Sequence, residues 1–358
     1  MATPVEKMEN VLTSLRSIFL AYGYSEYKMN KFEEYDLYVK NKDFLISDNV
    51  ITFTDTNGKL LALKPDVTLS IVKNSKVEDG LNKVFYSENV YRVSSKSNGY
   101  REIPQMGLEC IGKLDDYNVS EVITLATACL EKISSSFVLD LSPVAIVSAV
   151  VGGLELSSPI KTQVYKAVNE KNAHELKNIL TQNGVSEKDV LTLTTLVGLY
   201  GNVKEIMPKL KNLFLGTDKQ GLVEEFDAVI SSLSEKTKDK IKIDCSSCEN
   251  VKYYNGITFK GYVEGVPKAV LSGGRYDGLL KIMGKDSEAI GFAIYPDEFD
   301  RLFYEQKQYD VDVVLLYTEK TQASEVLKKA EEFISQGKTV SALKSVPETL
   351  TYKEVIKM

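Results

Sequence analysis

Two β-branched and aromatic stretches joined by a polar loop limit the folds open to this chain more than any other feature. Residues 84–93 and 101–111 are predicted strands, and Ser, Asn and Gly residues form the loop between them. Because side chains alternate between faces along a strand, the polar side chains of this hairpin gather on one face. They are Glu88, Arg92, Arg101, Gln105 and Glu109. This face is either the floor of a binding site or an ordinary exposed face with cross-strand ion pairs, and alternation alone fits both.

The size and composition of the chain exclude several classes of protein. Its 358 residues suffice for two or three structural units, and 43% hydrophobic with 26% charged residues is typical of a globular protein. The net charge of −6 argues against a nucleic-acid partner, and no apolar run is long enough to span a bilayer. The N-terminus lacks the pattern of a signal peptide. We therefore expect a cytoplasmic protein that contacts no membrane.

Metal, redox and nucleophile chemistry have little support in the sequence. Cys245 and Cys248 have the CxxC spacing of a zinc or redox pair, but there is no second pair, and His174 is the only histidine. A zinc site therefore lacks ligands, and a Ser-His or Cys-His nucleophile is nearly excluded. His174 lies in a polar run and is expected on a helix surface. No glycine-rich phosphate loop follows a strand, so no cofactor is predicted.

The first part of the chain alternates between helix and strand signals. Thr3-Pro4-Val5-Glu6 is a capping box with proline at the first helical position. The elements predicted from there on are a helix over residues 5–22, an extended segment over 24–38, a hairpin of 50–54 and 59–63, a helix from 67, and a helix over 119–133. Asp66 and Thr68 lie where the strand of this hairpin passes into the next helix.

The first domain is predicted to span residues 1–308. A helical insertion is predicted within it, at about residues 142–240. Its predicted helices cover 159–170, 174–182, 187–200 and 221–233. The domain then continues with strands over 241–244, 253–262 and 268–271, a glycine turn over 272–278, a strand over 290–294 and a helix over 299–306. A second domain, residues 309–358, is predicted as a βαβ fragment with a strand over 311–316, a helix over 323–336 and a β-type stretch over 339–343.

Four segments of the chain can be aligned with a known family. They are ALKPDVT, ENVYRVSSKSNGYREIPQMGLECIG, KYYNGITFKGY and LSGGRYDGLLKIMG. In this order and at these spacings they resemble the histidyl-tRNA synthetase family of class II catalytic cores, over residues 4–303. The resemblance implies an α+β fold, with a six- or seven-stranded antiparallel sheet flanked by helices, that normally forms a dimer. Residues 309–358 then resemble the truncated start of that family's anticodon-binding domain.

The same resemblance implies a pocket for histidine. It places Asp66 and Thr68 at the amino group of the ligand, where the synthetases usually have glutamate in place of Asp66. It further places Gln105 and Glu109 against histidine, Tyr253 and Tyr254 around the imidazole, Ser272, Gly273, Gly274 and Arg275 in the pocket floor, Arg92 at the α-phosphate of ATP, and Arg101 in the hairpin loop. The alternative is that these side chains are structural remnants of a vestigial pocket.

Several departures from the family concern ATP. Glu249 stands where the synthetases have an arginine that acts in amino-acid activation, although Lys252 follows closely, and Glu298 replaces an arginine on the ATP face. Tyr295 and Pro296 fill the place of a glycine and its apolar neighbour, and the proline of the dimer motif is Asn30. A charge about 4 Å from a phosphate is worth on the order of 4 kcal/mol near a protein surface. We therefore predict that both ATP-face contacts are lost, at Glu249 and Glu298, and that adenylate formation is not efficient.

A non-synthetase branch of the family has this combination of features, namely the regulatory subunits of ATP phosphoribosyltransferase. The resemblance to them implies a non-catalytic chain that forms a self-dimer and a hetero-octamer with the short-form catalytic subunit, and that is required for activity and for feedback inhibition by histidine in histidine biosynthesis. Two alternatives stay open, a divergent synthetase-like enzyme and a sensor of an amino acid or of tRNA. The sequence also leaves open whether histidine binds the pocket or a subunit interface.

Overall fold

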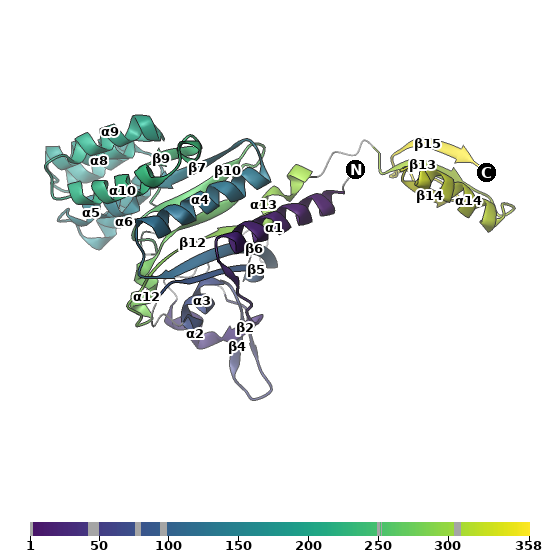
Figure 1. Ribbon diagram of the computed structural model, residues 1–358, viewed down its shortest axis with the longest axis horizontal. Coiled ribbons are helices and arrows are strands. Elements are labelled where there is room, and N and C mark those ends of the chain that lie inside the picture. The colour runs from purple at the N-terminus through teal and green to yellow at the C-terminus, as the bar shows by residue number, and fades with distance from the viewer. Residues whose placement is uncertain are drawn as a thin grey trace. The chain divides into compact units, whose positions relative to one another are not determined.

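The computed structural model describes residues 3–41, 50–75, 80–93, 99–248, 251, 253–303 and 309–358. The chain divides into two compact units, Met1–Leu302 and Phe303–Met358, which are described separately. Figure 1 shows the larger unit as a broad sheet with helices on it and a helical body at one end. No helix among the described residues is both long and apolar enough to cross a membrane.

One mixed sheet organises the larger unit. Its nine strands among the described residues follow the order β1-β5-β6-β12-β11-β10-β7-β9-β8. They are β1 (Ser25–Glu26), β5 (Asn82–Val93), β6 (Tyr100–Gly112), β12 (Glu288–Ile294), β11 (Leu271–Arg275), β10 (Thr258–Val263), β7 (Phe137–Ser142), β9 (Ile241–Asp244) and β8 (Tyr200–Asn202). The pairs β1–β5 and β7–β9 are parallel and the other neighbours antiparallel. The predicted fold class is therefore confirmed, with more strands than the six or seven expected.

The two faces of this sheet differ in polarity. A row of paired residues in the strand register is apolar, and it includes Phe85, Leu108, Phe292, Phe259 and Leu141. Helices α1 (Pro4–Ala21) and α4 (Asp116–Ile133) cover this face (Figure 1), and Phe19 of α1 contacts the rings of Phe85 and Phe292. The neighbouring row lies on the opposite face and is largely polar, because it contains Ser272, Lys260, Asp140 and Lys242. Helices α1 and α4 thus bury the apolar face of the sheet and do not cover its polar face.

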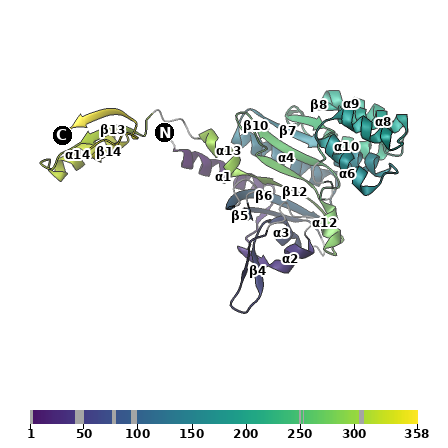
Figure 2. The same cartoon turned by 180° about the vertical axis from the view of Figure 1, so that it is seen from behind.

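Most of the predicted elements are present. The capping box of α1 is formed, since Thr3 Oγ1 accepts from the Glu6 backbone N–H at 3.2 Å and Glu6 accepts from Thr3 N–H at 2.7 Å. The hairpin β3 (Thr52–Thr54) and β4 (Leu60–Leu63) pairs as expected and extends from the body in Figures 1 and 2, together with β2 (Phe32–Glu34). The central hairpin has Arg92 opposite Arg101 and Glu88 opposite Gln105, which confirms the shared polar face.

Three local predictions are wrong. The extended segment predicted over residues 24–38 ends in the helix α2 (Tyr35–Lys40), whose Tyr38 is buried in the core. Tyr253 and Tyr254 precede β10 and are not part of a strand. The predicted glycine turn is instead strand β11, because its glycines let neighbouring strands approach closely. A Cβ added at Gly273 would lie 2.3 Å from the carbonyl oxygen of Gly291.

The insertion lies next to β8 and β9, at the end of the sheet far from β1 (Figures 1 and 2). Its helices are α5 (Val144–Gly152), α6 (Ser158–Asn169), α7 (Ala173–Gln182), α8 (Glu187–Val197), α9 (Val203–Phe214), α10 (Gln220–Ser232) and α11 (Glu235–Lys238). The sequence reading missed α5 and α9 and the strand β8. Helix α5 is rich in β-branched residues, and α9 contains Pro208, so local propensity argues against both. His174 lies on the exposed surface of α7, as predicted.

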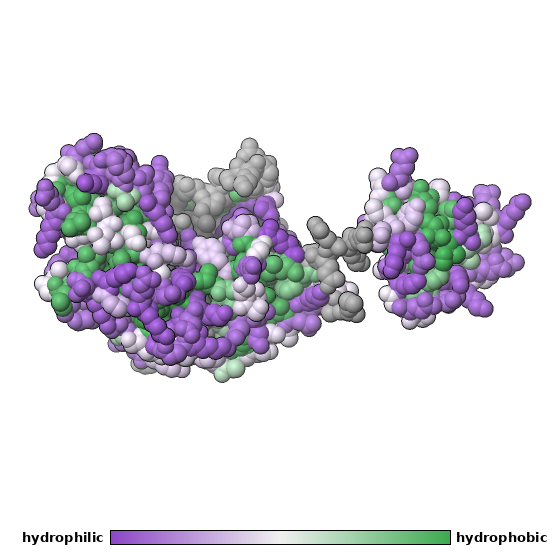
Figure 3. Space-filling view, turned by 90° about the horizontal axis from the view of Figure 1, so that it is seen from above, coloured by the Kyte–Doolittle hydropathy of each residue, from purple (hydrophilic) through white to green (hydrophobic). Residues whose placement is uncertain are grey.

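The remaining elements of the larger unit are α3 (Thr68–Asn74), α12 (Asp277–Ile282), α13 (Pro296–Phe299) and a 3-10 turn, Asp300–Phe303. The smaller unit is a three-stranded parallel sheet, β14-β13-β15, with one helix. Its elements are β13 (Val311–Leu316), α14 (Ala323–Ser335), β14 (Val340–Leu343) and β15 (Tyr352–Lys357), of which β15 was not predicted. Val313, Leu315, Val326 and Phe333 form its core. Apolar residues gather on the face of this unit that is visible in Figure 3, with hydrophilic residues around them.

Candidate functional site

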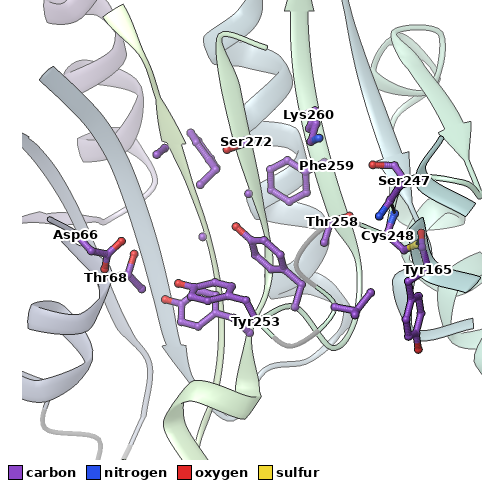
Figure 4. A pocket seen from close by; sticks show the side chains of 18 of the residues that line it. Asp66, Thr68, Tyr165, Ser247, Cys248, Tyr253, Thr258, Phe259, Lys260 and Ser272 are labelled. Carbon is purple, nitrogen blue, oxygen red and sulfur yellow. Dashed lines mark hydrogen bonds between the residues drawn. The ribbon is translucent and has the colours of Figure 1, made fainter. Parts of the chain in front are cut away.

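A cavity of about 850 Å³ lies on the polar face of the large sheet. Strands β5, β6, β12, β11 and β10 contribute residues to it, the start of α3 borders one end, and α6 of the insertion borders the other. Figure 4 shows Asp66 and Thr68 at one side of the view and Tyr165, Ser247 and Cys248 at the opposite side. A cavity of this size is typical of a site for a small molecule.

The structure brings together most of the residues that the sequence assigned to a pocket. Those that line the cavity are Asp66, Thr68, Arg92, Gln105, Glu109, Tyr253, Tyr254, Ser272 and Gly273. Gly274, Arg275, Arg101 and Glu298 are not among the lining residues. Glu249, Asn250 and Lys252 lie outside the described residues, so the prediction about the lost arginine at Glu249 stays a prediction.

Glu109 is the centre of the polar end of the cavity. Its side chain is 3% exposed and accepts hydrogen bonds from Thr68 Oγ1 at 2.8 Å and from the Tyr276 hydroxyl at 2.6 Å. The pKa of Glu109 is raised to about 8, mainly by burial, while the hydrogen bonds from Tyr276 and Thr68 act against the rise and the nearby Asp66 carboxylate adds a smaller increase. An acid held in this way gains most from a ligand that brings a positive charge or donates hydrogen bonds.

The carboxyl group of Glu109 has room because the residue opposite it on the neighbouring strand has no side chain. Gly291 of β12 lies directly opposite Glu109 in the register. A Cβ at Gly291 would lie 1.8 Å from Glu109 Oε2 and 2.4 Å from the carbonyl oxygen of Leu108. Glycine is therefore required at position 291 by the space that Glu109 occupies. The sequence reading missed Gly291 and Tyr276, although Tyr276 belongs to the quoted segment LSGGRYDGLLKIMG.

Asp66 is held by the first turn of α3. Its Oδ1 accepts the backbone N–H of Leu69 at 2.9 Å, and burial raises its pKa above the usual value for a carboxyl group. Arg92 lies beside Asp66, and its Nε donates to the carbonyl oxygen of Pro65 at 2.9 Å. Its Nη2 is buried without a hydrogen-bond partner among the described residues. This nitrogen is thus placed to donate to an anionic group in the cavity.

Tyrosines wall the space between the two carboxyl groups. The rings of Tyr253 and Tyr254 are 4.7 Å apart in an edge arrangement, and Tyr253 lies 5.5 Å from the ring of Tyr276. Burial raises the pKa of all three, so they are neutral rings with hydroxyl groups near neutral pH. Tyr295 also lines the cavity, and its hydroxyl lies 2.7 Å from Ser272 Oγ. Its side chain therefore takes up space that a glycine at this position would leave open.

Two predicted site residues have structural roles in this arrangement. Arg275 Nε donates to Asp277 at 2.9 Å, and its Nη2 pairs with Glu288, so it ties β11 to the start of α12 and to β12. Glu298 pairs with Lys268 at 2.7 Å. Its charge is matched by Lys268 outside the cavity, so the predicted repulsion of ATP by Glu298 gains no support from the structure.

The CxxC segment also has a structural role. Cys245 and Cys248 are buried and form no disulfide, and burial raises the pKa of the Cys245 thiol. The backbone N–H of Cys248 donates to Asn169 of α6 at 2.8 Å. Among the described residues, no three side chains of His, Cys, Asp or Glu are grouped to hold a metal ion. The segment thus ties the end of β9 to the insertion.

Glu109 makes stability depend on pH. Its folded pKa of about 8 lies above the value of about 4.3 in an unfolded chain. Between these values the folded state binds more protons than the unfolded state, so the free energy of unfolding falls as the pH rises, at most by about 1.4 kcal/mol per pH unit. We expect urea unfolding from pH 5 to pH 8 to show a steeper fall for the wild type than for Glu109→Gln. Equal slopes would contradict the raised pKa.

Comparison with known proteins agrees with the fold. Residues 3–299 match the family model described as histidyl-tRNA synthetase. An ATP phosphoribosyltransferase regulatory subunit of Caldanaerobacter subterraneus is 33% identical over 296 residues, which are 81% of this chain and 76% of that protein. A protein of the same name from Thermoanaerobacter sp. is 31% identical over 337 residues, 91% of this chain and 87% of that protein.

Solved structures show the same fold at lower identity. An ATP phosphoribosyltransferase regulatory subunit/histidyl-tRNA synthetase from Bacillus halodurans superposes with a TM-score of 0.73 and 23% identity, covering 99% of this chain and 94% of that chain. Histidyl-tRNA synthetase from Nostoc sp. gives 0.69 and 17%, covering 98% and 85%. A chain of the ATP phosphoribosyl transferase complex from Thermotoga maritima gives 0.62 and 17%, covering 81% and 97%.

These findings define a class II synthetase-like core, which carries the polar cavity on its sheet. The chain belongs to the histidyl-tRNA synthetase family, within its group of ATP phosphoribosyltransferase regulatory subunits.

Proposed function

We propose that this chain is the non-catalytic regulatory subunit of ATP phosphoribosyltransferase, and that the short catalytic subunit requires it for activity and for feedback inhibition by histidine in the first step of histidine biosynthesis. The observation that carries the proposal is the cavity around Glu109, which keeps buried acids, hydroxyls and tyrosine rings together. The names of the relatives at 31% and 33% identity support it.

Histidine fits the chemistry of the polar end. Its ammonium and imidazole N–H groups are donors, and Asp66, Thr68 and Glu109 present oxygen atoms there. Its carboxylate is a suitable acceptor for Arg92 Nη2, which has no hydrogen-bond partner among the described residues. The rings of Tyr253 and Tyr254 provide a flat wall for the imidazole. On binding, Glu109 would change from a mostly protonated acid to a carboxylate paired with the ligand. Hydrogen bonds to the charged carboxylate are stronger than those to the neutral acid.

Regulation follows from linkage between this pocket and the partner. A ligand that binds one assembly state more tightly shifts the population toward it, and a coupling of about 1–3 kcal/mol gives a regulatory response. The partner in the proposal is the short-form catalytic subunit, in a hetero-octamer built on self-dimers of this chain. The Thermotoga maritima protein is a complex of two kinds of subunit, HisG and HisZ, and this supports a partner of this type.

The proposal includes the organisation and location of the chain. We assign residues 1–308 to the synthetase-like core and 309–358 to an α/β unit that resembles the start of an anticodon-binding domain. We assign the protein to the cytoplasm, where its four cysteines, all buried and without disulfides, stay reduced.

The experiment is the formation of phosphoribosyl-ATP by the short catalytic subunit from the same organism, with and without this chain, across a histidine titration. We expect activation by the chain and suppression of that activation by histidine. No change in rate and no histidine response would overturn the proposal. Histidine-dependent exchange of pyrophosphate into ATP by the purified chain would instead identify a synthetase-like enzyme.

A further inference from the structure

Lys285 does not line the cavity, and its side chain reaches the C-terminus of helix α3. Its Nζ lies within 3.3 Å of four oxygen atoms, which are the carbonyl oxygens of Val72, Lys73 and Ser75 and the hydroxyl oxygen of Ser75. The last carbonyl groups of a helix have no partner within the helix, and a lysine ammonium group can satisfy them. Its positive charge also suits the negative end of the helix dipole. Lys285 thus caps α3, although it belongs to a distant part of the chain.

The end of helix α12 fixes the backbone of Lys285. Gly284 has a φ of +72°, in the left-handed region that glycine adopts without strain. The backbone N–H of Gly284 donates to the carbonyl oxygen of Lys281 at 3.1 Å. The backbone N–H of Lys285 donates to the carbonyl oxygen of Leu280 at 2.9 Å. These two bonds form a Schellman motif, which ends α12. Lys285 therefore joins the C-termini of α3 and α12.

The opposite ends of the same two helices meet at Glu109. Thr68, the first residue of α3, donates its hydroxyl to Glu109 Oε1 at 2.8 Å. Tyr276, directly before α12, donates its hydroxyl to Glu109 Oε2 at 2.6 Å. Helix α3 has seven residues and α12 has six, so each is about 10 Å long at about 1.5 Å per residue. The contacts of Lys285 thus lie about one helix length from the carboxyl group of Glu109.

Apolar side chains fill the space between α3 and α12, which lie side by side (Figures 1 and 2). Val72 of α3 and Leu279 and Leu280 of α12 are buried in one core cluster, which also contains Tyr276. Apolar burial has no preferred direction, whereas hydrogen bonds depend on distance and angle. The polar contacts of Lys285 therefore set the position of α3 against α12 more narrowly than the apolar packing does.

We propose that Lys285 is a positioning residue for the polar end of the cavity. It holds the C-termini of α3 and α12 together, and this keeps the hydroxyl groups of Thr68 and Tyr276 on the two oxygen atoms of Glu109 at the same time. Without the ammonium group, the last carbonyl groups of α3 lose their partner, and α3 shifts so that Thr68 no longer meets Glu109. The proposal deepens the regulatory role, and it rests on the proposed function only for the identity of the ligand.

The test is a double-mutant cycle of Lys285→Met and Thr68→Val, measured by urea unfolding of the full chain. Thr68→Val removes a hydrogen bond to a buried acid, so we expect it to raise the equilibrium constant of unfolding about tenfold in the wild type. In the Lys285→Met background this bond is already lost, and Thr68→Val should raise the constant by less than about threefold. Substitutions about 10 Å apart that share no partner are additive, so a purely local role of Lys285 would give the same effect in both backgrounds.

A control variant and a second measurement support this cycle. Lys281→Met removes an exposed lysine of α12, and in this background the effect of Thr68→Val should equal that in the wild type. If Lys285→Met does not fold, hydrogen exchange of the wild-type chain takes its place. The backbone amides of Ser75 and Lys285 should then have protection factors within about threefold of each other, because joined helix ends open together.

Histidine calorimetry extends the test to the ligand. Lys285→Met should weaken histidine binding at least about tenfold, whereas Lys281→Met should bind as the wild type does. The proposal is overturned by equal effects of Thr68→Val with and without Lys285, by unchanged histidine affinity of Lys285→Met, or by a Ser75 amide protected more than about tenfold less than that of Lys285. If the wild type itself does not bind histidine, the proposed function loses its ligand, and the unfolding cycle still decides the role of Lys285.

Discussion

Replacing Glu109 by glutamine is expected to weaken histidine binding about hundredfold and to remove histidine inhibition of the complex at concentrations that inhibit the wild type. Glutamine keeps the size of the side chain and can still bond Thr68 and Tyr276, but it cannot become an anion when a positively charged ligand arrives. A charged hydrogen bond in a buried site is worth about 1.5–3 kcal/mol, which is the basis of the hundredfold estimate. The measurement is histidine titration by calorimetry and by the rate of phosphoribosyl-ATP formation.

Glu298→Gln is the matched control for this prediction. It removes the same charge from a carboxylate that pairs with Lys268 and does not line the cavity. We expect its histidine response to equal that of the wild type. If Glu109→Gln retains full histidine sensitivity, the effector binds elsewhere, and a subunit interface becomes the place to search.

Period-two alternation was enough to predict the shared polar face of the central hairpin. It put Arg92 on the same face as Glu88, and Gln105 on the same face as Glu109, and the register of β5 with β6 joins these pairs into one surface. The prediction succeeded because a two-stranded hairpin is a local structure, whose facing residues are close in sequence. Whether that surface was exposed or lined a site depended on α6 and β12, which are distant in the chain.

Residues that depend on distant strands were not predicted. Gly291 lies opposite Glu109 only through the pairing of β6 with β12, so no nearby residue signals its role. Gly273 and Gly274 were read as a turn because glycine pairs usually mark turns, whereas close contact with β12 and Tyr254 requires them in a strand. The resemblance to the family placed these glycines in the floor of the pocket, which periodicity did not.

The surroundings of a single charge are hard to predict from sequence. Glu298 was predicted to mark a lost contact on the ATP face, and this stays a prediction; in the structure its carboxylate pairs with Lys268, which lies 30 positions earlier. Tyr295 is the departure that the structure places inside the cavity, where its ring takes up space and its hydroxyl meets Ser272. The steric change at position 295 thus has more structural support than the charge change at 298.

Replacing Gly291 by alanine is expected to lower the free energy of unfolding by about 3 kcal/mol and to abolish histidine binding. The added Cβ would overlap Glu109 Oε2 at 1.8 Å and the Leu108 carbonyl oxygen at 2.4 Å, so both the side chain and the strand must move. Overpacking that shifts backbone costs about 1–3 kcal/mol or more, and displaced Glu109 would lose its bonds to Thr68 and Tyr276. Urea unfolding and histidine calorimetry measure the two effects.

Gly221→Ala is the control that separates this steric effect from the general cost of replacing glycine. Gly221 lies in helix α10, and a Cβ there meets no atom within 4 Å. Alanine at that position should leave histidine binding unchanged and raise the free energy of unfolding by about 0.5–1 kcal/mol, because it restricts the unfolded chain and favours helix. A Gly291→Ala variant that is as stable as Gly221→Ala and still binds histidine would contradict the close packing of β12 against Glu109.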